Sequence, residues 1–386
     1  MFICANYPEK GGVETVTGLL ADFFLSKGNS VFLMVLEDPK KPISKQHRHY
    51  LQMVDMPGPL NSLLNISFLE NFIQTNQIDC VFNQGVNSQI YNSASKYPKT
   101  IFINTLHSRP FWEVHLFISS KWSDMLVLQK GIVQKAKMLM RCLLGWVHPD
   151  LTHPSIRRFY RNQIERADWF VVLDKAFKKE LESKLYQGDE QPKIRVIPNP
   201  LNNRTVRQTS KKKQVLFIGR LNAEPKRVDR LLRIWKSIEA QVPDWTLQIL
   251  GDGEQRGNLE KITHDLQLKN VFFRGFQNPE PFYQSASILC LTSTFEGAPM
   301  VITEAQSYGT VPIAFGSVES IYNMIDNGTN GVIVPPFDEG TYAKELLKLI
   351  QEENQLRLLS ENALSKVKDL NVENIGQQWL KLMDKH

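Results

Sequence analysis

Short apolar runs alternate with amphipathic stretches along almost the whole chain, and this alternation limits the possible folds more than any other feature. In the first half, the apolar runs predict buried strands at residues 1–5, 30–36, 80–83, 100–104 and 169–173. Between the first two runs, residues 13–25 carry apolar side chains at helical spacing, and Gly28 follows where such a helix would end. Strands that alternate with helices predict a parallel sheet covered by helices on both faces.

A second series of the same kind follows the proline-containing segment 197–200 and the polar stretch 202–213. Its strands are predicted at 214–218, 245–250, 271–273, 288–292, 311–315 and 332–334, with helices that include 228–239 and 342–352. The 386 residues also exceed the usual size of one hydrophobic core. We therefore predict an α/β protein with two Rossmann-like, doubly wound domains, residues 1–197 and 198–370, facing a central cleft. Ligands in such sheets bind beyond the carboxyl ends of the strands.

The composition is that of an ordinary globular protein, with 42% apolar and 22% charged residues, which argues against disorder. No apolar run is long enough to span a bilayer, and no basic region followed by an apolar run marks a signal peptide. The four cysteines are far apart and lack metal-ligand spacing, as expected for reduced thiols. These features predict a cytoplasmic location.

The net charge of +6 is concentrated in the segment between Lys130 and Arg166, which holds eight basic and two acidic residues. Such a segment predicts an anionic partner, either a lipid surface or a phosphorylated substrate. Apolar residues lie among its cations, so it could form a basic amphipathic helix at the inner face of a membrane. The alternative is that the apolar residues face the core of the first domain and the cations form a solvated rim.

A pair of glutamates, Glu296 and Glu304, flanks a predicted helix start near the C-terminal end of the chain. The main-chain amides that follow Glu296, at Gly297 and Ala298, could contribute to an anion site at that helix start. Carboxylates accept hydrogen bonds from sugar hydroxyls. The alternative is that both acids lie on a solvated helix face.

Two further strand–helix loops carry residues suited to a diphosphate. Arg220 and Lys226 follow the first strand of the second domain, and two cations there could hold a diphosphate as it leaves. Gly11 and Gly12 follow the first strand of the chain, where glycine lets the backbone approach a ligand closely. The alternatives are a solvated basic loop and a simple strand–helix turn.

Three more residues lie at predicted strand ends. Gly251 and Phe276 could face a nucleotide base, although most glycine turns at strand ends bind no ligand. His107 follows a buried strand and could act in the cleft or be structural. The chain has no Asp-x-Asp triad that would chelate a metal–diphosphate complex, no phosphate-binding loop ending in Gly-Lys-Ser/Thr and no zinc-binding helix. We therefore predict no metal site and no cofactor.

Taken in order, these motifs resemble the retaining glycosyltransferases of family 4, which have the GT-B fold. The resemblance rests on Gly11-Gly12-Val13-Glu14, Gly219-Arg220 with Lys226, Gly251-Asp252-Gly253, the pair Glu296 and Glu304, and Asn327-Gly328-Thr329-Asn330-Gly331. It also implies that a C-terminal helix, within residues 371–386, crosses back to the first domain. One departure is Asp174, which stands where many relatives have a serine.

The resemblance implies roles for the donor-binding residues. Gly12 would pack against the donor diphosphate, which Arg220 and Lys226 would bind from the other side. Glu296 would contact the transferred sugar, and Glu304 would accept hydrogen bonds from the ribose hydroxyls.

His107 matches the family's cleft histidine, which is expected near the C6 hydroxyl of the sugar. The implied activity is transfer of a hexosyl unit from a nucleotide sugar, with UDP as the expected nucleotide, to a saccharide or lipid-linked hydroxyl acceptor. Surface polysaccharide or glycolipid synthesis is the expected setting, without a nucleic-acid partner. The alternatives are a sugar-nucleotide epimerase of the same fold and a non-catalytic carbohydrate-binding protein.

Overall fold

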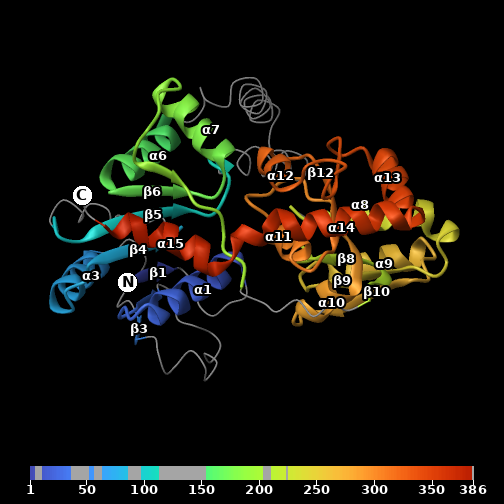
Figure 1. Ribbon diagram of the computed structural model, residues 1–386, viewed down its shortest axis with the longest axis horizontal. Helices are drawn as coiled ribbons and strands as arrows, with labels where there is room; N and C mark the ends of the chain where they lie inside the picture. Colours follow the sequence, from blue (N-terminus) through green and yellow to red (C-terminus); the bar gives the residue numbers. More distant parts are fainter. Residues whose placement is uncertain are drawn as a thin grey trace, which may run out of the picture. The chain divides into compact units, whose positions relative to one another are not determined.

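The computed structural model describes residues 1–4, 11–35, 52–55, 63–85, 97–112, 154–202, 210–222 and 225–384. Within them lie two parallel sheets, each flanked by helices (Figure 1). The chain separates into a first unit of Met1–Pro198 with Gly376–His386, and a second unit of Asn199–Ile375. Each unit is a Rossmann-like α/β domain, which confirms the predicted fold class.

The sheet of the first unit has the strand order β3-β2-β1-β4-β5-β6-β7, and all its neighbours pair in parallel. The apolar pattern predicts five of these strands and misses β3 and β7. The strands are β1 (Phe2–Cys4), β2 (Phe32–Val35), β3 (Gln52–Asp55), β4 (Cys80–Gln84), β5 (Ile101–Leu106), β6 (Trp169–Val172) and β7 (Ile194–Val196). The helices are α1 (Gly12–Ser26), α3 (Leu63–Thr75), α6 (Pro154–Arg166) and α7 (Lys175–Tyr186).

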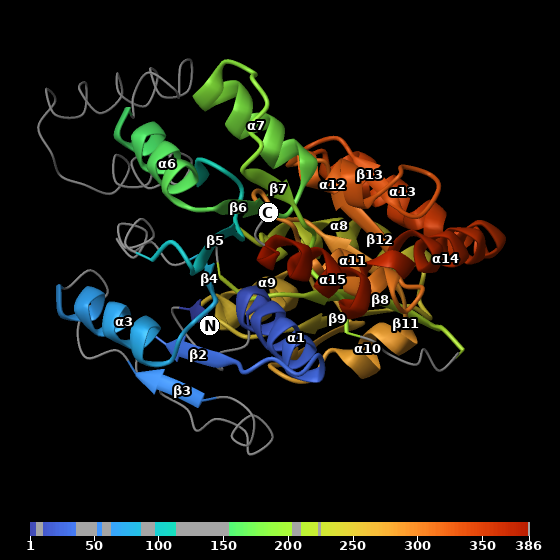
Figure 2. The same cartoon turned by 60° about the vertical axis from the view of Figure 1, so that its left-hand side comes forward.

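The C-terminal helix α15 (Val372–Met383) packs on the first unit through its second half. The Trp379 ring is buried and meets Phe82 of β4 edge to face, at 5.8 Å between centroids. Gly376 lies against α1 so closely that a Cβ there would stand 2.5 Å from the ring of Phe23. Figure 2 shows α1 and α15 lying side by side. Glycine at this position therefore allows the two helices to touch.

Helix α7 begins at a capping aspartate. The Asp174 carboxylate accepts a hydrogen bond from the Ala176 amide at 2.8 Å, which satisfies one of the open amides of the first turn. A serine could cap the same turn, so the departure at Asp174 preserves the local structure.

The described part of the basic segment is α6, and residues 130–153 lie outside the described residues. Two of its cations, Arg157 and Arg161, donate hydrogen bonds to the carbonyls of Lys184 and Leu185 at the end of α7. Cations at a helix C-terminus stabilise it, so these two arginines serve the fold. No helix within the described ranges is both long enough and apolar enough to cross a membrane.

The sheet of the second unit has the order β10-β9-β8-β11-β12-β13, again with every neighbour parallel. All six strands agree with the sequence pattern. They are β8 (Lys212–Ile218), β9 (Thr246–Leu250), β10 (Val271–Gly275), β11 (Ala286–Leu291), β12 (Val311–Phe315) and β13 (Val332–Val334). The helices are α8 (Val228–Ile238), α9 (Arg256–Asp265), α10 (Glu280–Ser285), α11 (Met300–Gln306), α12 (Glu319–Met324), α13 (Glu339–Gln351) and α14 (Glu353–Val367), with short 3-10 turns η2 (Glu239–Gln241) and η3 (Lys368–Leu370).

Alternate residues of β8 feed two separate cores, as expected for a sheet covered on both faces. Val215 and Phe217 pack with α8, α9, α13 and α14, while Leu216 packs with α10 and α11. Because β8 lies at the centre, with β9 on one side and β11 on the other, the chain order reverses between β8 and β11. The carboxyl end of that strand pair is the expected ligand position in this fold.

Candidate active site

In the second unit, the loops that follow β8 and β11 are bound to each other. The Thr294 amide donates to the Pro225 carbonyl at 2.8 Å, and the Thr292 hydroxyl donates to the Arg227 carbonyl at 3.1 Å. Between these loops, Lys226 Nζ lies 2.7 Å from Glu296 Oε1. The structure therefore brings together two predicted site residues that are far apart in the sequence.

This ion pair is largely shielded from water. The side chains of Lys226 and Glu296 are 19% and 9% exposed. Burying a charge is costly unless it is paired, and here each charge neutralises the other. The pair presents a cation suited to a phosphate and a carboxylate suited to hydroxyl groups, side by side at the carboxyl end of the sheet.

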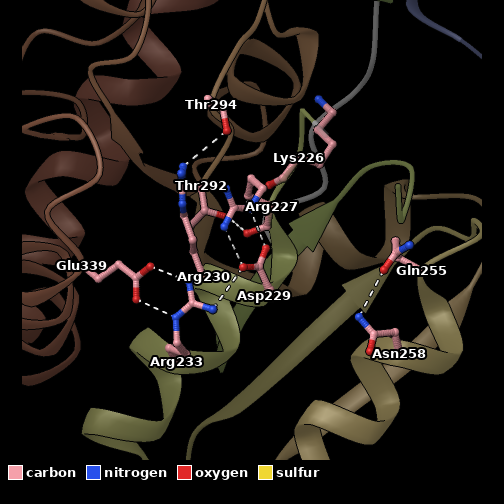
Figure 3. A network of polar contacts seen from close by, with 10 residues as sticks. All are labelled: Lys226, Arg227, Asp229, Arg230, Arg233, Gln255, Asn258, Thr292, Thr294 and Glu339. Carbon is pink, nitrogen blue, oxygen red and sulfur yellow. Dashed lines mark hydrogen bonds and ion pairs between the residues drawn. The ribbon is translucent and has the colours of Figure 1, made fainter. Parts of the chain in front are cut away.

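The backbone beside Lys226 is fixed by a network of charged side chains (Figure 3). Arg227 has a positive φ of 47° and carries the chain into α8. Its guanidinium binds the Asp229 carboxylate through two hydrogen bonds of 2.9 Å, and Arg233 joins the same carboxylate to Glu339 of α13. Burial alone would raise the pKa of Asp229, but the hydrogen bonds from Arg227 and Arg233 outweigh it and lower the pKa to about 2.

The loops after β8 and β9 touch through glycine. Gly251 has a φ of +132°, and a Cβ on it would lie 1.8 Å from the Gly219 carbonyl oxygen. A Cβ on Gly253 would lie 2.7 Å from the Leu221 carbonyl oxygen. Packing against Gly219 is therefore enough to explain why glycine stands at position 251, which the sequence suggested as a ligand residue. The same contact fixes the loop that carries Arg220 and Lys226.

Glu304 lies on the second turn of α11. Its Oε2 accepts a hydrogen bond of 2.7 Å from the hydroxyl of the buried Tyr283. Ahead of the helix, the Gly297 carbonyl accepts a hydrogen bond of 2.6 Å from the Ser320 hydroxyl, which holds the turn that continues through Ala298. Pro299 caps the helix without a side-chain hydrogen bond.

Arg220 and Phe276 are exposed, unlike the shielded pair Lys226 and Glu296. Arg220 is exposed on the loop after β8, and among the described residues its side chain has no ion-pair partner. Phe276 follows β10 and is 59% exposed. Both remain predictions as ligand residues.

In the first unit, His107 follows β5 and pairs with the last residue of β4. Its Nε2 lies 2.6 Å from Gln84 Oε1. The ring is half-buried, and desolvation lowers its pKa to about 4, so it is neutral at pH 7. Among the described residues, the buried Gln84 Nε2 and Thr105 Oγ1 have no hydrogen-bond partner. Buried polar groups are usually satisfied in native proteins, so a polar ligand atom here would complete the site.

Gly11 and Gly12 form the start of α1, also in the first unit. Gly11 is the N-cap and has no side-chain hydrogen bond, and Gly12 is exposed. The Glu14 side chain lies over Gly11, so that a Cβ on Gly11 would stand 2.3 Å from Glu14 Oε2.

Within the described ranges, no three His, Cys, Asp or Glu side chains come together as a metal site would require.

Sequence reasoning missed two residues of these sites, Gln84 and Tyr283. Gln84 could have been found, because it is a polar residue that ends an apolar strand run. Tyr283 has no comparable signal, since an aromatic residue in a short helix is typical of any core.

Both halves of the chain match known family models. Residues 10–204 match the model described as Glycosyltransferase Family 4, and residues 201–366 match Glycosyl transferases group 1. The chain belongs to glycosyltransferase family 4. The family predicted from the ordered motifs is therefore confirmed.

This chain spans about half the length of the two curated relatives described here. A glycosyltransferase of Haemophilus influenzae is 28% identical over 184 residues, which are 47% of this chain and 52% of that protein. An α-1,4-N-acetyl-D-galactosaminyltransferase of Campylobacter jejuni, named for a diphospho-undecaprenol-linked acceptor, is 31% identical over 173 residues, 45% of this chain and 48% of that protein.

Solved structures extend the likeness to the whole chain. HepE from Anabaena, determined with UDP-glucose, superposes with a TM-score of 0.71 at 17% identity and covers 98% of this chain and 97% of its own. WaaG, a glycosyltransferase involved in lipopolysaccharide biosynthesis, has a TM-score of 0.68 at 14% identity, with 100% and 99% covered. At such identities the likeness shows the fold alone, and that fold is GT-B.

Proposed function

We propose that this protein is a retaining glycosyltransferase that moves a hexosyl unit from a UDP-sugar to a hydroxyl acceptor without a metal ion. The observation that carries the proposal is the shielded contact between Lys226 Nζ and Glu296 Oε1, at 2.7 Å, where the chain order of the sheet reverses. A nucleotide sugar carries a phosphate next to a sugar, and a cation beside a carboxylate suits these two neighbouring groups.

In the reaction, the acceptor oxygen bonds to C1 of the sugar as the bond from C1 to the leaving phosphate oxygen breaks. The acceptor enters on the same face, and its hydroxyl proton passes to the departing phosphate. Negative charge develops on the nucleotide, and Lys226 and Arg220 stabilise it. One well-placed electrostatic donor contributes about 3 kcal/mol to such a step.

The other predicted residues complete the proposal. Gly12 approaches the diphosphate from the first unit, Glu304 binds the ribose hydroxyls, and neutral His107 contacts the sugar. HepE has been solved with UDP-glucose, which supports UDP as the nucleotide. Named relatives act on diphospho-undecaprenol-linked sugars, lipopolysaccharide and poly(glycerol phosphate), which supports an acceptor in surface polysaccharide or glycolipid synthesis.

A lipid-linked acceptor would suit a peripheral position on the cytoplasmic face of a membrane. The basic segment between Lys130 and Arg166 supports this placement, although Arg157 and Arg161 are engaged with α7.

Nucleotide release tests the transferase proposal. The purified protein is mixed with UDP-, GDP- and ADP-sugars, with and without a polyprenyl-diphosphate saccharide, and free nucleoside diphosphate is measured in excess chelator. We expect UDP release that depends on the acceptor, persists without divalent ions and gives a product with the anomeric configuration of the donor. Release without acceptor, inversion at C1, or loss of turnover that magnesium restores would each contradict the corresponding part of the proposal.

A further inference from the structure

Tyr283, a buried residue of α10, donates a hydrogen bond to Glu304 of the neighbouring helix α11. Its ring is fully buried, and its hydroxyl lies 2.7 Å from Glu304 Oε2. Because a phenol donates to an ionised carboxylate, the bond runs from Tyr283 to Glu304. Hydrogen bonds to charged acceptors are stronger than neutral ones, so this bond restricts the carboxylate effectively.

Tyr283 is itself held from two directions. Its ring stacks on Tyr308, with 5.8 Å between centroids and 8° between planes. Its main-chain carbonyl accepts hydrogen bonds from Lys211 Nζ at 2.8 Å and from the Thr310 hydroxyl at 2.7 Å. A phenol anchored in this way can fix the position of whatever its hydroxyl binds.

We infer that Tyr283 is a positioning residue that orients the Glu304 carboxylate toward the ribose hydroxyls of the donor nucleotide. The inference rests on the proposed function, because it takes Glu304 as the ribose ligand. In metal sites, groups that orient a ligating side chain lower the affinity for the metal when they are removed, and the same reasoning applies to a carboxylate that binds hydroxyl groups. The ability to distinguish ribose from deoxyribose should therefore depend on a hydroxyl that never touches the nucleotide.

The test compares nucleotide affinities by calorimetry. UDP, GDP and ADP are screened by thermal shift, and the best binder and its 2′-deoxy form are then titrated into wild type, Tyr283→Phe and Glu304→Gln. We expect Tyr283→Phe to weaken binding of the ribonucleotide by roughly threefold to tenfold, in line with one lost hydrogen bond. Binding of the 2′-deoxynucleotide should change less, so that the ratio between the two affinities shrinks.

Tyr342→Phe is the matched control. The Tyr342 hydroxyl is also fully buried in the second unit, but it donates to the Ile313 carbonyl at 2.7 Å, within the sheet. The same hydroxyl accepts a hydrogen bond from the Leu291 amide at 3.2 Å. Its removal therefore costs two buried hydrogen bonds without touching Glu304, and the ratio of affinities should stay at the wild-type value. A purely structural role of Tyr283 would make the two variants alike.

The outcomes separate the inference from the proposed function. If Glu304→Gln lowers the preference for ribose and Tyr283→Phe keeps it at the wild-type value, the positioning role is wrong and the ribose assignment stands. If Glu304→Gln keeps the preference, or if no nucleotide binds, the ribose assignment fails and the positioning role fails with it.

Discussion

Replacing Gly251 with alanine should strongly destabilise the second unit. The residue has a φ of +132°, and its new Cβ would lie 1.8 Å from the Gly219 carbonyl oxygen. A non-glycine residue in such a conformation costs about 1–3 kcal/mol. Relief of the overlap moves a backbone rather than a flexible side chain, which adds about 1–3 kcal/mol. We therefore expect a loss of about 2–6 kcal/mol in the free energy of unfolding of this unit.

The loss should be readable in two ways. For a unit of this size, each kcal/mol lowers the melting temperature by about 2–4 °C, so calorimetry should record a decrease on the order of 10 °C. Hydrogen exchange should quicken in peptides that cover 212–222 and 246–256, because Gly219 N donates to Leu250 O between them at 3.0 Å. The bond from Gly251 N to Gly275 O, of 2.9 Å, extends the expected effect to the end of β10. Nucleotide binding should weaken as well, since the loop after β8, which Gly251 contacts at Gly219, also carries Lys226.

Gly257→Ala is the matched control. Gly257 lies in α9, and a Cβ there would meet nothing within 4 Å. Alanine is favoured over glycine in a helix by up to about 1 kcal/mol, so this variant should be as stable as wild type or slightly more stable. If Gly251→Ala melts within a degree or two of Gly257→Ala, the packing argument for Gly251 is wrong.

Three other predictions concern the site and the partner. Arg220→Ala and Lys226→Ala should each lower turnover on the order of 10²-fold. The exposed Arg220 can be removed with little change in melting temperature, whereas Lys226→Ala should also lower the melting temperature, because it leaves the shielded Glu296 carboxylate without its cation. Near wild-type turnover of a folded double variant would rule out their role. Because the pKa of His107 falls from 6.5 to about 4 on folding, the unfolded chain takes up this proton first, and stability should fall as the pH drops from 6.5 to 4. His107→Gln should lessen that fall in acid-unfolding curves, and parallel curves for both proteins would contradict the burial argument. The protein should sediment with anionic vesicles at low salt and be released at high salt, each cation near the surface adding about 1 kcal/mol, whereas equal, negligible binding to neutral and anionic vesicles would favour the solvated-rim alternative.

The sequence predicts the sheet of the second unit strand by strand, because buried parallel strands are continuous apolar runs bounded by glycine or polar residues. It misses β7 (Ile194–Val196), which has only three residues and an exposed arginine at its centre. It also misses β3 (Gln52–Asp55), a four-residue edge strand with a polar residue at each end. Short edge strands lack the long apolar pattern on which the prediction depends.

The sequence motifs name residues of the candidate site, but they do not show which of those residues contact one another. The motifs suggest Lys226 and Glu296 separately, while their 2.7 Å contact follows from the pairing of β8 with β11, which strand spacing alone does not reveal. The hydrogen bond from Tyr283 to Glu304 depends in the same way on the placement of α10 beside α11. Pairwise contacts across elements are set by strand order and helix packing, so local patterns cannot supply them.

Two kinds of support hold the Lys226 loop, and they should respond differently to salt. The first is steric, since Gly219 and Gly251 touch through backbone atoms, and ionic strength has no effect on it. The second is ionic and runs from Arg227 through Asp229 and Arg233 to Glu339, where the Arg233 side chain is 44% exposed. Salt weakens ion pairs that are open to solvent, so this part should weaken as salt rises. Asp229→Asn should therefore reduce nucleotide affinity most at low salt, whereas Gly251→Ala should reduce it equally at all salt concentrations.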